Sequence, residues 1–433
     1  MKKLALVCLT PPFDGNEMPL PMPSYGIHRI HAAALATARD TGTDVRLFDL
    51  GVLGAAECQR QLLAFGPDAV GYSVYVWSLD PLLDLANAVS KALPQVVTLF
   101  GGPSARRQSF KMAYYAARSG CVDLICEGDG EAVICALMEL PGLDRAHLAT
   151  LPGVRLANGT GGWDLTTGQR VIAMAELPSP YQMNLMPEGA VAYLETYRGC
   201  PLSCRFCAWG DTRPAREVFP ADYISREIAA FRNLRAPAVF LLDAGLNLNA
   251  RAFRNLSEAH ARDGFLSESL FWAEIYPTIA KPEHLEFLSS VGTAYLGVGL
   301  QSIDPHVLRA HDRPFEMSRF ATAMEALSRV AGMEIQIIMG LPEDTPEGFR
   351  ATLAFALSLP VSSVRVYHCL VLPDALLSRG KPSWRLDFDP VNLTMRSNHT
   401  WSAADIAAMR AELDSKVHKH GGDAGAFWWA FRK

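Results

Sequence analysis

The stretch ETYRGCPLSCRFCAWG, residues 195–210, places Cys200, Cys204 and Cys207 within eight positions of one another. It overlaps the end of AVAYLETYRG (190–199), an apolar run that we expect to form a buried strand. The three thiols are therefore expected in a loop at the carboxyl end of that strand. Thiolates at this spacing bind either zinc or an iron–sulfur cluster.

The number of cysteines bears on the choice of metal. A structural zinc site normally has a fourth Cys or His close by, and the first histidine after the triad is His260. A [4Fe–4S] cube held by three cysteines instead leaves one iron open, and an open iron can chelate a substrate. The sequence favours the cluster; zinc and three buried structural cysteines are the alternatives.

Length and composition set the architecture. A chain of 433 residues is too long for one core, since cores stop growing at roughly 250–300 residues, so we expect two domains and a tail. The composition, 49% hydrophobic and 20% charged, is typical of a soluble globular protein, and no apolar run reaches the length of a membrane span. The N-terminal run LALVCL (4–9) resembles a signal peptide but no small-residue cleavage site follows, so we expect a first buried strand.

Charge and cysteine usage narrow the partners and the compartment. The net charge is −5 and no basic run is present, which disfavours nucleic acid as a partner. Most of the six other cysteines lie in apolar runs, where free cysteine behaves as a small core residue, which favours a reducing cytoplasm over a disulfide framework. These six are Cys8, Cys58, Cys121, Cys126, Cys135 and Cys369.

Residues 1–140 alternate short apolar runs with amphipathic stretches, which predicts a Rossmann-like (flavodoxin-like) α/β domain with a parallel sheet. The expected strands are 4–9, 44–50, 69–75, 96–102 and 122–128. Ligands of such sheets bind beyond the carboxyl ends of the strands. The loops that begin at Pro11, Ser73, Gly101 and Glu127 are therefore expected on one rim.

The rest of the chain is predicted to hold a linker, a second α/β domain and a tail. Residues 141–188 are the linker, with NGTGGW (158–163) as a hairpin turn. Six strand–helix units in 189–375 predict a partial (β/α)6 TIM barrel, with its site at the carboxyl ends of the strands. Its strands are expected at 190–199, 238–245, 270–277, 294–302, 334–342 and 364–373. Residues 376–433 form a small α/β C-terminal extension with one helix capped by Ser402. Its tryptophans either cover the site or anchor the extension.

The CxxxCxxC pattern with Phe206 directly before its last cysteine resembles the radical S-adenosylmethionine (SAM) superfamily. The resemblance covers about 190–375. It implies that Cys200, Cys204 and Cys207 bind a [4Fe–4S] cluster, whose unique iron takes the amino and carboxylate groups of SAM, and that Phe206 contacts the bound cofactor. One electron from the cluster then cleaves SAM to methionine and a 5′-deoxyadenosyl radical.

Further positions of the second domain match this family. Asp243 and Asn247 stand where its second strand faces the amino end of SAM, although the usual Gly-Gly-Glu form is absent. Glu274 is an acid in an apolar strand, so it contacts SAM or the cluster, or forms an internal ion pair. Gln301 and Ser302 correspond to residues that reach the ribose or carboxylate of SAM, and Arg313 either pairs with that carboxylate or is a solvated surface residue. IIMGLPEDT (337–345) matches the segment that packs the adenine, or is a simple turn into a helix.

The first domain, over about 1–140, resembles the cobalamin-binding domains that precede many radical SAM barrels. The residues that this resemblance assigns to the corrin and its nucleotide tail are Ser73, Tyr75, Val76, Trp77, Gly101, Gly102, Glu127 and Gly128. Tyr75, Val76 and Trp77 would lie under the lower face of the corrin; for Trp77 the alternative is ordinary packing at the sheet end. The Asp-x-His-x-x-Gly signature that supplies a histidine to cobalt is absent.

Together these resemblances imply a cytoplasmic, cobalamin-dependent radical SAM methyltransferase. Methylcobalamin formed from one SAM would methylate a carbon of a small molecule, such as an amino acid or natural-product intermediate, after the deoxyadenosyl radical removes hydrogen. A rearrangement, cyclisation or ring contraction without methyl transfer is the first alternative, and a module that binds cobalamin but no longer cleaves SAM is the second. The expected partners are the substrate and an external electron donor such as flavodoxin or ferredoxin.

Overall fold

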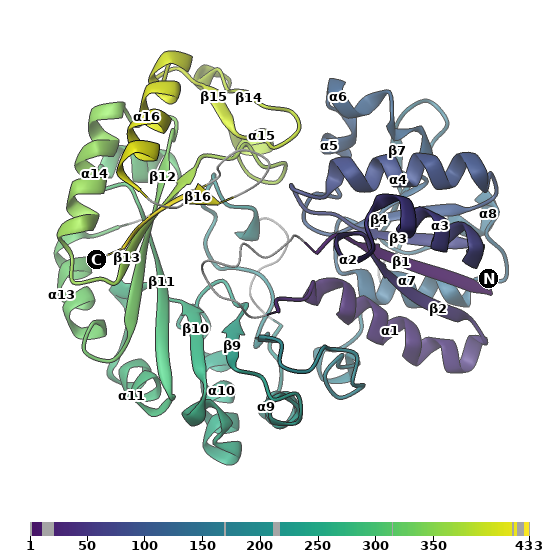
Figure 1. Cartoon of the computed structure of the whole chain (residues 1–433), viewed down its shortest axis with the longest axis horizontal. Coiled ribbons are helices and arrows are strands. Elements are labelled where there is room, and N and C mark those ends of the chain that lie inside the picture. Colours follow the sequence, from purple (N-terminus) through teal and green to yellow (C-terminus); the bar gives the residue numbers. More distant parts are fainter. Residues whose placement is uncertain are drawn as a thin grey trace. The chain divides into compact units, whose positions relative to one another are not determined.

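The computed structural model describes residues 2–10, 21–168, 170–210, 217–313, 315–417, 420–421 and 428–432. The chain divides into two compact units, Met1–Pro187 and Glu188–Lys433. Each unit is an α/β structure built on a mainly parallel sheet (Figure 1). The loop predicted to begin at Pro11 lies outside the described residues.

The first unit contains a seven-stranded sheet with the order β2-β1-β3-β4-β5-β6-β7. Its first five members are parallel, and their order is that of flavodoxin-like doubly wound sheets. The five strands match the predicted runs, β5 being shorter than expected. The strands are β1 (Lys3–Cys8), β2 (Asp44–Asp49), β3 (Ala69–Ser73), β4 (Val97–Gly101), β5 (Leu124–Ile125), β6 (Arg155–Ala157) and β7 (Trp163–Leu165).

Helices cover both faces of this sheet, which explains why its strands are apolar runs rather than alternating patterns. In β1, Ala5 and Val7 join a core with α3 and α4, while Leu4 and Leu6 join a second core with α1 and α7. The predicted first buried strand is therefore confirmed. The helices are α1 (Tyr25–Thr41), α2 (Leu50–Leu53), α3 (Ala55–Phe65), α4 (Leu79–Ala92), α5 (Arg107–Lys111), α6 (Ala113–Ala116), α7 (Gly130–Glu139) and α8 (Arg145–Leu148), with 3-10 turns η1 (Ser119–Cys121) and η2 (Met174–Glu176).

The segment 141–188, predicted as a linker, contains two strands of the first sheet. Its NGTGGW turn joins β6 and β7 as an antiparallel hairpin, as expected, with Gly159 and Gly161 at positive φ. The hairpin also pairs with β5, a contact that no local sequence pattern predicts. A short hairpin gains stability by adding to an existing sheet, because two isolated strands are only marginally stable in water.

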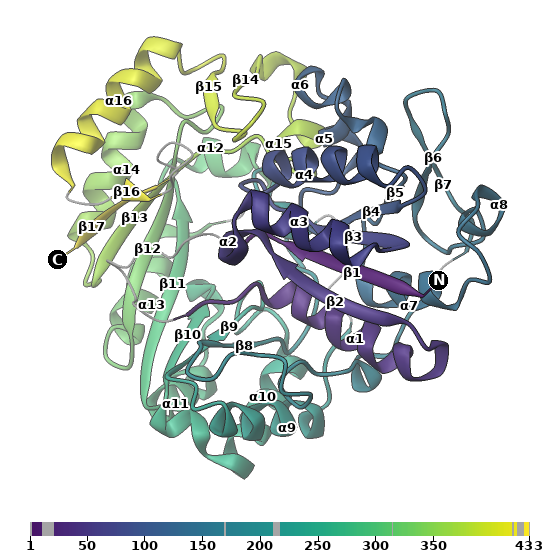
Figure 2. The ribbon, with the colours of Figure 1, turned by 45° about the vertical axis from the view of Figure 1, so that its right-hand side comes forward.

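The second unit contains an eight-stranded sheet with the order β16-β17-β13-β12-β11-β10-β9-β8. The six predicted strands appear in chain order and are parallel. Helices α10, α11, α13 and α14 lie along one face of this sheet (Figure 1, Figure 2). The six strands are β8 (Ala192–Leu194), β9 (Ala238–Leu241), β10 (Leu270–Glu274), β11 (Thr293–Gln301), β12 (Gly332–Met339) and β13 (Ser363–His368).

The helices of this unit connect the strands and form part of the extension. Ser402 caps α16 through a capping box with Asp405, as predicted for Ser402. The elements are α9 (Ala221–Asn233), α10 (Ala250–Asp263), α11 (Pro282–Ser290), α12 (Pro305–Ala310), α13 (Met317–Leu327), α14 (Pro346–Ser358), α15 (Leu376–Arg379) and α16 (Ala403–Lys416), with 3-10 turns η3 (Ala208–Gly210), η4 (Phe265–Glu268), η5 (Pro277–Ile279) and η6 (Pro382–Trp384).

The C-terminal extension belongs to the second unit and completes its sheet. β17 (Trp428–Arg432) pairs antiparallel with β13, and β16 (His420–Gly421) pairs with β17; a separate hairpin joins β14 (Asp387–Phe388) and β15 (Met395–Ser397). Trp384, Trp401 and Trp429 are each 0% exposed, so they anchor the extension. None of the helices formed by the described residues is both long enough and apolar enough to cross a bilayer.

Candidate functional site

The cysteine loop follows β8 at its carboxyl end, as predicted. Cys204 is 5% exposed, and Cys200 and Cys207 are half-buried. The amide of Cys207 donates to the carbonyl oxygen of Cys204 over 3.0 Å, which closes a turn between the last two thiols. All nine cysteines are free thiols in this structure, so no disulfide competes for the triad.

The three thiols are near enough to interact through their charges. The pKa of Cys207 is raised to about 11, chiefly by burial, with the neighbouring Cys204 and Cys200 contributing to the rise. Burial likewise raises the pKa of Cys200, with Cys204 adding to the effect. Three adjacent thiolates therefore need compensating positive charge, which iron supplies. Within the described residues no three His, Cys, Asp or Glu side chains are placed to hold a single metal ion. A [4Fe–4S] cube does not require such a group, because each cysteine binds a different iron.

Arg313 lies beside the cysteine loop rather than on the solvated surface. Its Nη1 is 3.7 Å from Sγ of Cys204, and its Nη2 donates to the carbonyl oxygen of Gly299 in β11. The guanidinium carbon also lies 5.3 Å from the ring centre of Tyr276. The surface interpretation of Arg313 is therefore wrong, and a fixed positive charge stands next to the central thiol of the triad.

Gln301 ends β11 in a strained conformation. Its φ is +67°, and the pairing of β11 with β12 shifts register between Gly299 and Gln301. A non-glycine residue in this region costs free energy, and such positions cluster at functional sites. Oε1 of Gln301 and Nε of Arg313 are both buried and have no hydrogen-bond partner among the described residues. Both side chains lie against Gly299, and that of Arg313 also reaches Cys204. An open acceptor and an open charged donor at this place fit a ligand that carries amino and carboxylate groups.

Glu274 ends β10, and its hydrogen-bond partner is the amide of Gln336 in β12 at 2.9 Å. Burial raises the pKa of Glu274, while the Gln336 hydrogen bond opposes the rise. A neutral amide does not offset the burial of a full negative charge. The carboxyl group of Glu274 therefore binds a proton more readily than an exposed glutamate does.

Asp243 and Asn247 have hydrogen-bond partners within the protein. Asp243 accepts the amides of Thr196 and Tyr197 at 2.8 and 3.3 Å, together with the hydroxyl of Thr196. These contacts fix the backbone between β8 and the cysteine loop. Asn247 exchanges two hydrogen bonds with the backbone of Tyr276, at 2.8 and 3.0 Å. Their predicted SAM contacts stay predictions.

Ser302 and Phe206 also have structural partners. The hydroxyl of Ser302 accepts the amide of Asp304 at 3.1 Å, just before α12. The ring of Phe206 lies 5.7 Å from that of His311 and packs against an apolar cluster that includes Leu376 and Trp384. Phe206 therefore ties the cysteine loop to the core, and the cofactor contacts predicted for both residues stay predictions.

In the first unit, the predicted residues gather at the carboxyl ends of β3, β4 and β5, which are neighbours in the sheet. Backbone bonds join the loops that follow: the amide of Val74 donates to the carbonyl of Gly101 over 2.8 Å, and that of Ser104 to the carbonyl of Val74 over 3.1 Å. Gly102 has φ +101°, and a Cβ there would lie 2.7 Å from the carbonyl oxygen of Val74. Only glycine fits this junction without strain.

The aromatic pair after β3 is exposed on one side. The rings of Tyr75 and Trp77 stack with centres 4.7 Å apart and planes 12° apart, and Trp77 is 42% exposed. Val76, which lies between these two residues in the sequence, is half-buried, and so is Ser73 at the end of β3. A flat stacked surface of this kind fits a large planar ligand; packing at the sheet end remains the alternative for Trp77.

The last rim residues lie after β5. Glu127 pairs with Arg155 of β6 and accepts the amide of Arg107 over 3.2 Å, so its carboxylate already has protein partners. Gly128 is exposed, and a Cβ at this position would meet nothing within 4 Å. Contacts from either residue to a corrin stay predictions.

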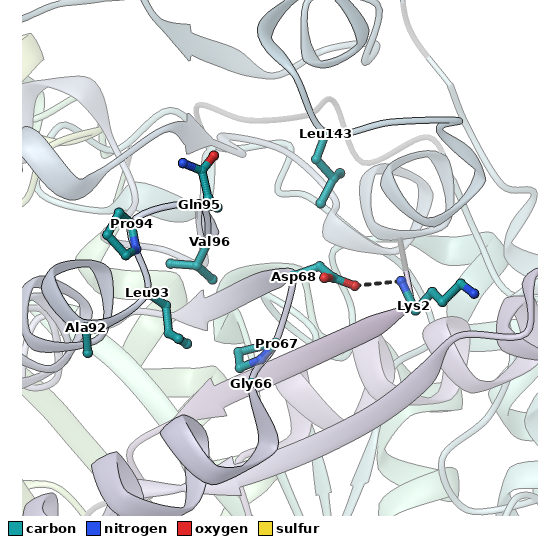
Figure 3. Close-up of a pocket in the computed structure, with 10 residues that line it drawn as sticks. All are labelled: Lys2, Gly66, Pro67, Asp68, Ala92, Leu93, Pro94, Gln95, Val96 and Leu143. Atoms are coloured by element: carbon teal, nitrogen blue, oxygen red, sulfur yellow. Dashed lines mark hydrogen bonds between the residues drawn. The ribbon is translucent and has the colours of Figure 1, made fainter.

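A surface depression of about 580 Å³ lies at the opposite edge of the first sheet (Figure 3). Its lining residues include Lys2, Asp68 and Val96, which directly precede or stand next to the amino ends of β1, β3 and β4. Asp68 is occupied by the backbone amides of Lys2 and Lys3 at 2.7 and 2.9 Å. The depression therefore does not belong to the rim at the carboxyl ends.

Comparison with known families decides the nature of the second unit. Residues 194–356, which include the cysteine loop and the strands from β9 to β12, match the sequence model of the radical SAM superfamily. The chain carries a radical SAM domain. The match ends within α14, before the C-terminal extension begins.

Two relatives and one solved structure are similar over more of the chain. A 2-(S-pantetheinyl)-carbapenam-3-carboxylate methyltransferase from Streptantibioticus cattleyicolor is 29% identical over 71% of this chain and 48% of its own length. The cobalamin-dependent radical SAM methyltransferase TokK from Streptomyces tokunonensis is 27% identical over 72% of this chain and 48% of its own. This chain thus spans about half the length of these relatives.

The structural likeness extends through both units. The radical SAM methyltransferase TsrM from Kitasatospora setae, solved with cobalamin and a [4Fe–4S] cluster, matches with a TM-score of 0.67 over 95% of this chain and 91% of its own. The identity is 16%, so the likeness is one of fold. A radical SAM domain preceded by a doubly wound unit is the architecture that the two chains share.

Several residues around the radical SAM site were not predicted from the sequence. Gln336 carries no motif, and only its pairing with Glu274 reveals it. Arg205 is a basic residue inside the CxxxCxxC pattern, so its position in the motif could have indicated a role in the loop. Arg379 donates a hydrogen bond to the backbone of Cys207, 172 residues earlier in the chain, and no local sequence pattern predicts this contact.

Proposed function

We propose that this chain is a cobalamin-dependent radical SAM methyltransferase that methylates a carbon of a small molecule, such as an amino acid or natural-product intermediate. One observation carries the proposal: the three thiols, the charge of Arg313 and the open acceptor of Gln301 gather at the carboxyl ends of β8 and β11 in a radical SAM domain. The two named methyltransferases among the relatives support the reaction class.

The second unit would hold the cluster and SAM. Cys200, Cys204 and Cys207 would bind the cluster, and Gln301, Arg313 and Glu274 would orient SAM. When bound, the cluster supplies the electron that cleaves SAM, and cobalamin carries the methyl group. Arg313 places the positive charge of its guanidinium beside the sulfur of Cys204. An external donor such as flavodoxin or ferredoxin would supply the electron.

The first unit would hold cobalamin. Residues 1–140 would form its binding domain, and 141–188 would form the connection, whose β6–β7 hairpin extends the same sheet. Residues 189–375 would form the partial barrel and 376–433 the extension. Gly101 and Gly102 would admit the corrin close to the backbone, and Tyr75, Val76 and Trp77 would cover its lower face without a histidine on cobalt. The fold shared with TsrM supports this assignment.

Anaerobic reconstitution with iron, sulfide and hydroxocobalamin tests the proposal. We expect about four iron atoms and one corrin per chain, as [4Fe–4S] stoichiometry requires. With SAM and a reductant, the protein should release methionine and 5′-deoxyadenosine, and a candidate substrate should gain the mass of one CH₂ unit. A product of unchanged composition would favour the rearrangement instead, and a protein that binds corrin but never cleaves SAM would refute both.

A further inference from the structure

We propose that Arg379, in the C-terminal extension, is a positioning residue for the cluster: it holds the cysteine loop in its ligating shape and raises the reduction potential of the cluster. The inference rests on the proposed function, since it needs the cluster. It adds a residue that lies outside the region matched by the radical SAM superfamily.

The guanidinium of Arg379 contacts both ends of the loop segment from Ser203 to Cys207. Nη1 of Arg379 donates to the carbonyl oxygen of Ser203 over 3.3 Å, and Nη2 donates to that of Cys207. Ser203 directly precedes Cys204, so the fork spans the segment that contains two of the three ligands. Carbonyl groups of an irregular loop need partners from elsewhere, and a charged fork provides two at once.

A second arginine, which lies in the cysteine loop, donates a hydrogen bond to the extension. Arg205, between Cys204 and Cys207, donates from Nη1 to the carbonyl oxygen of Arg379 over 2.9 Å. Its Nε lies 2.8 Å from the carboxylate of Asp312, and its amide donates to the carbonyl of His311 over 3.0 Å. The loop is therefore tied on one side to the extension and on the other to the segment after α12.

The position of Arg379 is itself fixed by packing. It ends α15, a four-residue helix whose first residue, Leu376, is 0% exposed in an apolar cluster with Trp384. Phe206, from the cysteine loop, packs against the same cluster. Movement of α15 would thus disturb the apolar and polar contacts of the loop together.

The charge of Arg379 has a consequence for the redox chemistry. A cluster with three thiolate ligands becomes more negative on reduction, and a nearby fixed cation stabilises the reduced form more than the oxidised form. Arg379 reaches the backbone of a ligand residue, so its charge acts at short range. A neutral residue at this position should make the cluster harder to reduce.

The test compares wild-type protein with Arg379→Met, Arg379→Lys and, as a matched control, Arg385→Gln. Arg385 is an exposed arginine of the same extension, six residues further along the chain. Each full-length protein is reconstituted anaerobically. Iron loss to a chelator is followed by absorbance, and the potential is measured by redox titration with electron paramagnetic resonance. The apo-proteins are compared by thermal unfolding.

For Arg379→Met we expect chelator-driven iron loss roughly 10- to 100-fold faster than in wild type, the usual effect of losing an outer-shell partner, and a more negative potential. Arg379→Lys should keep most of the potential but lose iron faster, because an ammonium cannot span two carbonyls as a planar fork does. Arg385→Gln should match wild type. A potential and iron loss unchanged in Arg379→Met, or a fall in thermal stability alone, would overturn the inference. Wild-type protein that takes up no iron would instead overturn the proposed function, before any variant is compared.

Discussion

The carboxylate of Glu274 reaches from β10 across β11 to the amide of Gln336 on β12, 2.9 Å away. Gly297, the β11 residue paired with Glu274, leaves room for this contact. A Cβ on Gly297 would lie 2.2 Å from Oε1 of Glu274. A half-buried acid at the end of β10 is therefore held by two residues that no motif identifies.

Gly297→Ala should displace Glu274 from Gln336. The lost hydrogen bond and the steric conflict with the half-buried carboxylate should lower the free energy of unfolding by about 1–3 kcal/mol. The measurement is urea unfolding of the apo-protein. In the double variant Gly297→Ala with Glu274→Ala the conflict is absent, so the two changes should couple favourably in a double-mutant cycle. Purely additive effects would contradict the arrangement.

Asp243 should make stability depend on pH. Burial raises its pKa from 3.8 to about 7, while the bonds from Thr196 and Tyr197 oppose the rise. A carboxyl group with a raised pKa in the folded state binds more protons there than in the unfolded state. Its contribution to stability is therefore full below about pH 4 and is lost as the pH rises towards 7. Each tenfold difference in proton affinity between the folded and unfolded states corresponds to about 1.4 kcal/mol.

Asp243→Asn tests this dependence, because asparagine keeps the shape and cannot ionise. The variant should gain stability relative to wild type between pH 5 and pH 8, measured as the difference in the free energy of unfolding at each pH. Asn247→Asp, which adds a nearby acid without removing Asp243, serves as a comparison and should lose stability over the same range. A difference between Asp243→Asn and wild type that stays constant with pH would rule out the raised pKa.

Replacing any one of Cys200, Cys204 or Cys207 by alanine should abolish stable cluster uptake, because each is one of three ligands. Cys369→Ala is the matched control: this thiol is 1% exposed and packs in an apolar cluster of the same unit. Its loss should cost about 1 kcal/mol of stability through a small cavity, yet leave iron content unchanged. Iron and sulfide analysis after reconstitution separates the two cases, and a triad variant that retains a full cluster would refute the assignment.

The parts of the fold that could be predicted are those encoded locally. Buried parallel strands are continuous apolar runs, so β1 and β3 were visible in the sequence, and Ser402 marks the start of α16 through its cap. β17 was missed because its pairing with β13 joins segments more than 60 residues apart. The triad follows from spacing, whereas the bonds that place it, from Arg379 and Arg313, arise only when the chain folds.

The two adjacent glycines after β4 separate folding from ligand binding in the first unit. Gly102→Ala places a residue that disfavours φ +101° against the carbonyl of Val74, so stability should fall by about 1–3 kcal/mol.

At Gly101 a new Cβ would meet only Cβ of Cys126, at 3.9 Å, an ordinary contact. Gly101→Ala should therefore fold as wild type does. If the corrin lies against this turn, the extra methyl group should nevertheless weaken hydroxocobalamin uptake, measured by absorbance after gel filtration. Gly120→Ala, in the same unit and with open space around its new Cβ, should bind corrin normally. Equal corrin uptake by Gly101→Ala, Gly120→Ala and wild type would place the cofactor elsewhere, because a methyl group added at this turn would clash with a large planar ligand bound there.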